Sequence, residues 1–376
     1  MDFELNRENR MIVNAVKDWI AKECPEESVR EWDEAGGPPE NIRTKFLALG
    51  FTGLCIPEAY DGDGPDYLGS ALVTEVIASR YPALARAYGS MTFYGGGVFS
   101  ELASEEQKKA FLPKFVNGQG GVGVLIAGLD STEGEPQRFL PLVSGESRSA
   151  VSGSGRCVGP SGDGDIVLFP ASAANRNNSE INTYCVTVNR EGMQISSDET
   201  LGYKGNAGAR VSFNDMAVGP ADMLGNAGNE AWPRLLGFVR LELAAEAVGV
   251  ARGSFEYAVK YAKQRVQFGR PIARFPAIRD MFVQNKCDIE AAAMLLYRAA
   301  AAADKGKDFA AEASRAYYVA CRTARRTALD GLQILGGYGY TMEFAAQRYV
   351  RDAVSLYNTG AESEGLKSVL SRQIGI

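Results

Sequence analysis

Apolar residues recur at helical spacing through the last third of the chain. They form one face in residues 243–262, and further periodic runs cover residues 275–304, 308–335 and 342–354. Helices with alanine-rich faces bury those faces against one another, so the pattern predicts an antiparallel four-helix bundle over residues 227–376. The face of the first helix is formed by Leu243, Ala247, Val250, Ala251, Phe255, Ala258, Val259 and Ala262.

The first 118 residues also follow a helical pattern. Charged residues 105–109 precede apolar residues 110–112 and predict a short helix that begins near Glu105. Residues 53–57 and 60–65 contain the glycines and prolines of a turn between two helices. We therefore expect an N-terminal helical domain over residues 1–118.

The composition changes near residue 119, where Gly, Ser, Val, Thr and Asn replace the mixture of Ala, Leu, Glu and Lys. Residues 165–169, 182–188 and 209–213 are rich in β-branched and aromatic side chains, which is typical of strands. Because no helical pattern separates these segments, parallel crossovers are not expected and the strands should be antiparallel. The pattern predicts a middle β domain over residues 119–226, in a multidomain α+β protein.

The chain has 376 residues and no histidine. This absence excludes a Ser-His-Asp triad, a histidine-liganded zinc and a histidine proton shuttle. The chemistry must come from carboxylates, hydroxyls, thiols, backbone amides or a bound cofactor.

Charge and cysteine spacing exclude further classes of protein. The 40 Lys and Arg are interspersed with 46 Asp and Glu, which argues against a nucleic-acid surface. No apolar run approaches the length of about 20 residues that spans a bilayer, and the first residues, MDFELNRENRM, are too polar for a signal peptide. The six cysteines are far apart with no CxxC pair, so we expect free thiols, no metal site and a cytoplasmic location.

Two sequence blocks stand out in the last third. Residues 261–272 read YAKQRVQFGRPI, preceded by Arg240 and the small residues after it. Residues 333–340 read QILGGYGY and are followed by RDA at residues 351–353. These blocks match the RxQFGxPI and QxxGGxGY…RDA signatures of the acyl-CoA dehydrogenase family, in the same order and about 70 residues apart. The C-terminal third therefore resembles that family.

Weaker matches continue through the rest of the chain. Residues 53–58 resemble the family's GLxVPE turn, residues 105–118 its EEQKxxxLPxxxxG segment, and residues 213–220 the strand that ends its β domain. The resemblance implies the same three-part fold. It also implies FAD-dependent α,β-dehydrogenation of an acyl-CoA thioester, with an electron-transfer flavoprotein as the electron acceptor.

The family's catalytic base is absent from its expected positions. In that family a glutamate shortly after RDA removes the α proton. An ungapped alignment from Arg351 places Gly360 there, and Val239 occupies the alternative position. Glu362, Glu364 and Glu242 lie near these positions. Because acidic residues in a first helical turn are ordinary, we expect structural roles for them, with Glu362 as the candidate for a displaced base.

The positions that would hold the flavin ring also depart from the family pattern. In place of the TEPxAGSD loop this chain has residues 125–131, which read LIAGLDS. Cys157 replaces the tryptophan of the NGxKxWIT strand, and Gly159 replaces the threonine that follows it. The resemblance therefore implies that this chain's own ring pocket is incomplete.

The motifs that reach a neighbouring subunit are retained. In the family, the flavin ring lies on one subunit, while the bundle of its neighbour binds the adenosine and pyrophosphate end. The resemblance assigns cofactor binding to Arg265, Gln267, Phe268, Gln333, Gly336 and Gly337, and substrate binding to Arg240. Pro276 departs from the family's usual glutamine.

This asymmetry suggests a base-deficient subunit that supports the FAD of a paralogous partner, in an α2β2 heterotetramer that acts on an acyl-CoA substrate. Two alternatives stay open. One is a self-sufficient flavoenzyme that uses Glu362, and the other is a flavin-free scaffold or binding protein.

Overall fold

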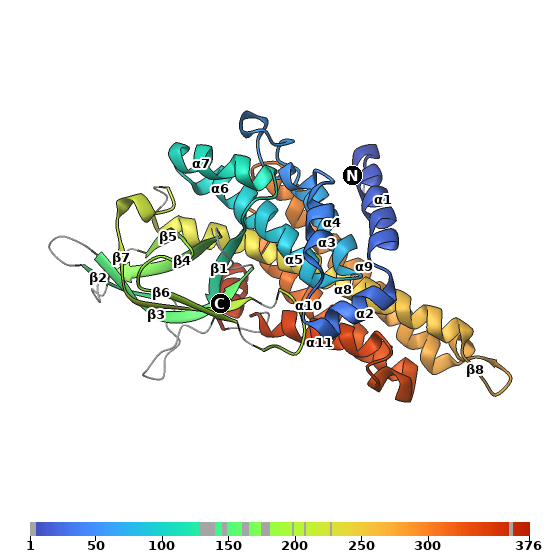
Figure 1. Ribbon diagram of the computed structural model, residues 1–376. Coiled ribbons are helices and arrows are strands. Elements are labelled where there is room, and N and C mark those ends of the chain that lie inside the picture. Colours follow the sequence, from blue (N-terminus) through green and yellow to red (C-terminus); the bar gives the residue numbers. More distant parts are fainter. Residues whose placement is uncertain are drawn as a thin grey trace.

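The computed structural model describes residues 5–127, 140–144, 149–159, 165–173, 181–197, 199–206, 208–225, 228–360 and 364–376. In Figure 1 the strands gather at one end of the molecule, and the longest helices run from them to the hairpin that contains β8. The N-terminal helices pack along this body. Among the described residues, no helix is both long enough and apolar enough to cross a membrane.

The N-terminal part is helical, as its pattern predicts. The predicted start of a helix at Glu105 is confirmed, because Ser104 and Gln107 cap one another's backbone N–H groups at the beginning of α7. A π-helical turn, Ser90–Gly97, separates α5 from α6. The helices are α1 (Arg7–Glu23), α2 (Glu26–Ala35), α3 (Glu40–Leu47), α4 (Tyr67–Ala78), α5 (Pro82–Gly89), α6 (Val98–Leu102) and α7 (Glu105–Val116).

The middle part is a sheet of mixed direction. The strands are β1 (Val122–Ala127), β2 (Leu140–Ser144), β3 (Ser149–Val158), β4 (Ile166–Ala173), β5 (Ile181–Thr187), β6 (Met193–Ser197) and β7 (Ala209–Val218). Antiparallel pairing, which we expected throughout, holds for β1–β3, β2–β3, β3–β7, β4–β5 and β6–β7. In contrast, β4 runs parallel to β1 and β2. The chain between β1 and β4 passes through β2 and β3, so strands provide the crossover that we expected only from a helix.

In its described residues, the C-terminal part contains the four predicted helices and a short fifth. They are α8 (Ala231–Gln264), α9 (Pro276–Ala303), α10 (Ala310–Leu335), α11 (Ala346–Asn358) and α12 (Glu364–Gln373). The two-residue strands β8 (Val266–Gln267) and β9 (Arg270–Pro271) form a hairpin between α8 and α9. The alanine-rich face of α8 is buried, and its core is continuous with that of the N-terminal helices. This packing places the hairpin at the far end of the bundle (Figure 1).

Candidate functional site

An open cavity of about 630 Å³ lies at the hairpin end of the bundle. Its walls come from the β8–β9 hairpin, the start of α9 and the turn Gly336–Tyr340 that follows α10. The structure brings together here five of the six predicted cofactor residues, namely Arg265, Gln267, Phe268, Gly336 and Gly337. The sixth, Gln333, is exposed on the last turn of α10 and does not line the cavity.

Phe268 and Gly269 form the tight turn between β8 and β9. Their φ angles are 50° and 74°, as in the two-residue turns that join antiparallel strands. Glycine adopts a positive φ freely, whereas phenylalanine does so at a conformational cost. The turn leaves Phe268 92% exposed, edge-to-face against Phe275 with 6.2 Å between ring centroids. It therefore holds a flat aromatic surface at the cavity wall.

The guanidinium of Arg265 and the backbone of two glycines form another part of the cavity wall. The Arg265 guanidinium lies over the Tyr338 ring, 5.7 Å from its centroid. Gly336 has a φ of 60°, and a Cβ added to Gly336 or Gly337 would meet no atom within 4 Å. Such a side chain would project into open space beside the backbone. A cation, exposed rings and glycine backbone are the groups that bind the phosphates and rings of a nucleotide.

Gly360 occupies the position that the resemblance assigns to the catalytic glutamate. It follows the end of α11 with a φ of 124°, a conformation that residues with a side chain rarely adopt. The chain therefore has no glutamate at this position, and the backbone conformation here is also unsuited to one. Glu362 falls in residues 361–363, outside the described residues, so its role as a displaced base stays a prediction.

We expect Gly360→Ala to lower the free energy of unfolding by about 1–3 kcal/mol, because alanine at this φ is strained. Urea denaturation measures the loss. Gly219→Ala is the matched control, since Gly219 has a φ of -138° and open space around it. Equal stability of the two variants would contradict the backbone conformation at Gly360.

Arg240 lies on α8, where its predicted role is substrate binding. Burial lowers the pKa of its guanidinium to about 10, and its Nη1 donates a hydrogen bond to Ser314 Oγ at 3.0 Å. Arg240 lines neither the bundle-end cavity nor the cavity described next. A direct contact between Arg240 and substrate therefore remains a prediction.

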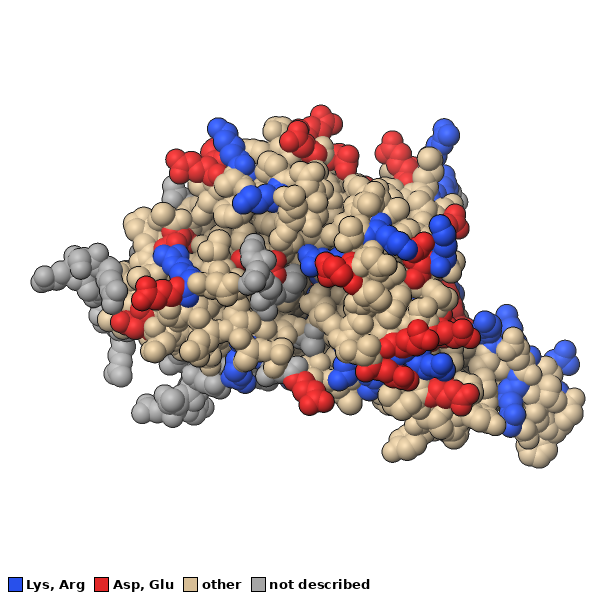
Figure 2. All heavy atoms as spheres, in the orientation of Figure 1, with Lys and Arg blue, Asp and Glu red and all other residues tan. Residues whose placement is uncertain are grey.

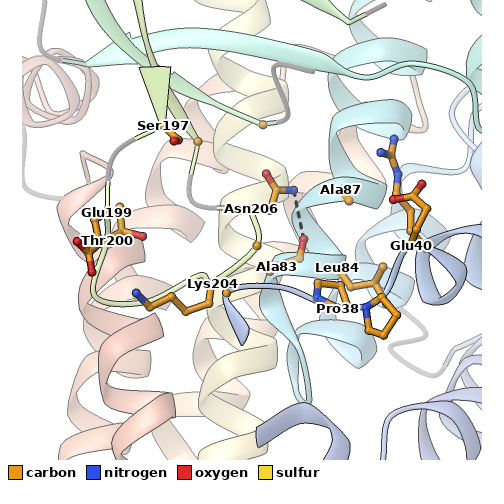
Figure 3. A pocket seen from close by; sticks show the side chains of 16 residues that line it. Pro38, Glu40, Ala83, Leu84, Ala87, Ser197, Glu199, Thr200, Lys204 and Asn206 are labelled. Atoms are coloured by element: carbon orange, nitrogen blue, oxygen red, sulfur yellow. Dashed lines mark hydrogen bonds between the residues drawn. The ribbon is translucent and has the colours of Figure 1, made fainter. Parts of the chain in front are cut away.

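A second cavity, of about 570 Å³, lies between α5, the start of α3 and the loop after β6 (Figure 3). Asn206 Nδ2 donates to the carbonyl of Ala83 across it, and Tyr81 Oη donates to the carbonyl of Lys204. Gly159 also lines this cavity. The φ of Gly159 is 96°, and an added Cβ would lie 2.6 Å from the carbonyl oxygen of Val122. The position cannot accept the family's threonine without rearrangement.

Cys157, at the tryptophan position, faces away from solvent. It is buried in the core of the sheet with residues such as Phe169 and Phe213. Burial raises the pKa of the Cys157 thiol to about 12, so the thiol stays protonated. It provides neither an aromatic wall nor a nucleophile. Of the aligned loop at 125–131, residues 128–131 lie outside the described residues.

We expect one fast-reacting thiol per native chain at pH 8. Among the six free cysteines, Cys287 is exposed and the others are buried. Titration with a chromogenic disulfide reagent, before and after denaturation, counts the reactive thiols. Cys287→Ser should remove the fast phase, and Cys157→Ser should leave it unchanged.

Comparison with known proteins identifies the family of this chain. Residues 6–119 match a profile of the acyl-CoA dehydrogenase N-terminal domain, and residues 226–375 match one of the C-terminal domain. The chain belongs to the acyl-CoA dehydrogenase family. Members of this family are FAD-dependent oxidoreductases.

Acyl-CoA dehydrogenases and related reductases resemble this chain over nearly its whole length. The caffeyl-CoA reductase-Etf complex subunit CarC of Acetobacterium woodii is 29% identical, covering 92% of this chain and 93% of CarC. A short-chain-specific acyl-CoA dehydrogenase of Megasphaera elsdenii is also 29% identical, covering 94% of each chain. The structure of butyryl-CoA dehydrogenase from the same organism superimposes with a TM-score of 0.88 at 27% identity, covering 100% of both chains.

The residues of this acyl-CoA dehydrogenase homologue fit the two ends of FAD differently. The bundle-end cavity fits the adenosine and pyrophosphate end, because it combines the Arg265 cation, the exposed Phe268 ring and the open backbone at Gly336. The described positions for the isoalloxazine ring do not fit. Cys157 is in the sheet core, and Gly159 leaves no room for a hydroxyl-bearing side chain.

A buried polar network of this homologue was not predicted from the sequence. Arg86 on α5 donates to Glu246 on α8, with 2.6 Å between Nη2 and Oε2. Tyr203 Oη donates to the same Oε2 at 2.8 Å, and the Arg86 guanidinium lies 4.0 Å from the centroid of its ring. These groups tie α5, α8 and the loop after β6 together, and so fix two walls of the second cavity relative to each other.

Glu242 extends this network, and its position corrects our expectation of an acidic residue in a first helical turn. It lies in the interior of α8 and is fully buried. Burial, together with the nearby Glu246 carboxylate, raises the pKa of Glu242 well above its usual value. Tyr94 Oη donates to Glu242 Oε2 at 2.6 Å. Two glutamates four residues apart on a largely apolar helix were the available signal in the sequence.

Proposed function

We propose that this chain is the base-deficient subunit of a heteromeric FAD-dependent acyl-CoA dehydrogenase. It pairs with a catalytically complete paralogue in an α2β2 heterotetramer and binds the adenosine and pyrophosphate end of the paralogue's FAD. One contrast carries the proposal. Five predicted cofactor residues meet in one cavity, whereas the backbone at Gly360 and Gly159 is unsuited to the glutamate and threonine of a complete site.

Each retained residue has a role in binding. When bound, FAD supplies the acceptor for the hydride that leaves Cβ of an acyl-CoA thioester. Arg265 donates charge-assisted hydrogen bonds to the pyrophosphate, Phe268 packs against the adenosine, and the backbone at Gly336 approaches the phosphates. A carboxylate of the partner removes the α proton, because Gly360 has no side chain to do so.

Flavin stoichiometry tests the proposal. The chain is co-expressed with each acyl-CoA dehydrogenase paralogue of its source organism, and the purified complex is assayed for flavin, protein and acyl-CoA oxidation. We expect one flavin per pair of chains, and activity that depends on the partner's glutamate. One flavin on every chain would contradict the proposal. A yellow, active chain purified alone, inactivated by Glu362→Gln, would instead favour the displaced base.

The proposed redox partner is an electron-transferring flavoprotein. CarC is, by its name, a subunit of a complex that contains Etf. A solved chain from work on the electron transferring flavoprotein of Acidaminococcus fermentans superimposes with a TM-score of 0.89 at 26% identity, covering 100% of both chains. Both relatives support this partner. The six unpaired cysteines support a cytoplasmic location for the complex.

A further inference from the structure

The hairpin end of the bundle carries a concentrated positive charge. Residues 257–279 contain six of the chain's 40 Lys and Arg and none of its 46 Asp and Glu, although the whole chain has a net charge of -6. All six side chains are exposed, and Figure 2 shows basic side chains gathered at this end of the molecule. This basic end consists of Lys260, Lys263, Arg265, Arg270, Arg274 and Arg279.

The described structure does not neutralise this charge. Asp280, which follows the segment, is the one described carboxylate that pairs with any of the six, at 4.0 Å from Arg279. Arg265 and Arg270 lie over aromatic rings, at 5.7 Å from Tyr338 and 4.3 Å from Phe275. The positive charge is therefore available to a partner.

The pyrophosphate of one FAD would pair with only part of this positive charge. Arg265 is the one cation of the six that lines the bundle-end cavity. The other five lie outside the cavity wall, beyond the groups that contact a ligand inside it. Phe268 and Tyr340, 92% and 85% exposed, extend the same surface. Arginine and aromatic side chains are enriched in the cores of protein interfaces.

We propose that the basic end docks on an acidic surface of the partner subunit, around the opening of the partner's flavin site. This inference rests on the proposed function and adds the charge of the partner's surface. Opposite charges on the two surfaces accelerate association and orient the partners before close contact forms. Phe268 and Tyr340 then lose their exposure as the surfaces meet.

A second copy of this chain is a poorer fit. The acidic side chains of α2 are one candidate for such a surface, but Glu26 pairs with Arg80 and Arg348, and Asp33 pairs with Arg351. The remaining acidic residues of α2 are exposed, namely Glu27, Glu31 and Glu34. These three carboxylates could pair with only half of the six cations of the basic end.

Association kinetics with the flavoprotein partner test the docking surface. The rate constant is measured by stopped flow at about 50 mM and about 500 mM NaCl, across which exposed charges become screened. We expect the higher salt, or the variant Lys260→Glu with Arg274→Glu, to slow association at least about tenfold. The corresponding glutamine variant should have an intermediate effect. Lys17→Glu with Lys109→Glu, on the N-terminal helices, makes the same change in net charge and should not slow association.

The outcomes separate this inference from the proposed function. A complex with one flavin per pair that forms at the same rate in all variants and salt concentrations contradicts only the docking surface. Failure of every paralogue to bind contradicts both. Salt-sensitive self-association of the isolated chain, seen by analytical ultracentrifugation and abolished by the glutamate variant, would make a second copy the occupant and overturn the inference. Circular dichroism confirms that each variant is folded.

Discussion

Arg265→Ala in the heteromeric complex is expected to weaken FAD retention by about tenfold to hundredfold. Among the described residues, Arg265 is the one cation that lines the bundle-end cavity, and the substitution removes its charge-assisted hydrogen bonds to the pyrophosphate. The substitution also separates the hairpin from the Tyr338 ring. Flavin release on serial dilution, followed by fluorescence of the freed cofactor, measures the change in affinity.

Arg298→Ala is the matched control for this experiment. Arg298 is an exposed arginine of α9 that lies outside the cavity wall, so its loss should leave flavin retention within about twofold. If the Arg265→Ala complex retained its flavin fully, the bundle-end cavity would have no role in binding the cofactor. That result would favour the alternative of a flavin-free scaffold, in which Arg265 contributes only to the packing of the bundle.

The architecture was largely predictable because each part has its own periodicity. The apolar residues of α8, α9 and α10 repeat at helical spacing over many turns, which fixes both the type and the approximate length of these helices. The parallel pairing of β4 with β1 and β2 was not predictable in this way. The alternation of apolar residues along a strand identifies its buried face but not the direction of its neighbour.

The candidate site was likewise predictable from the sequence only in part. Arg265, Phe268 and Gly336 belong to recognisable motifs, and the bundle fold brings the two motifs to one cavity. The network of Arg86 and Glu246 has no motif, because its partners lie 160 residues apart on helices that pack side by side. Likewise, the sequence shows that Gly360 lacks a carboxylate, but only the structure shows that its φ disfavours one.

Arg86→Met is expected to destabilise the protein by about 3–5 kcal/mol, the usual effect of removing one partner from a buried ion pair. The side chains of Arg86 and Glu246 are 3% and 0% exposed, so water cannot solvate the carboxylate that remains. Tyr203 would still donate to Glu246, but it would lose the guanidinium over its ring. Urea unfolding of the purified complex measures the loss as a shift of the transition midpoint.

Arg234→Met is a closely matched control. Arg234 also pairs through two nitrogens with a glutamate, Glu101, and also joins α8 to an N-terminal helix. Its side chain is 20% exposed and that of Glu101 is 27% exposed, so water can solvate the remaining carboxylate and the expected loss is below about 1 kcal/mol. Similar losses of stability for Arg86→Met and Arg234→Met would show that burial of the ion pair does not determine the cost of removing its arginine.

The double variant Arg86→Met with Glu246→Leu separates the cost of an unpaired charge from that of lost packing. Removing both members leaves no buried charge from the pair, so the double variant should be more stable than Arg86→Met alone. It should stay less stable than the unmodified protein, because the hydroxyl of Tyr203 loses its acceptor. A double variant as unstable as the sum of the two single variants would mean that Arg86 and Glu246 act independently. The network would then not be what holds α5 and the loop after β6 in place around the second cavity.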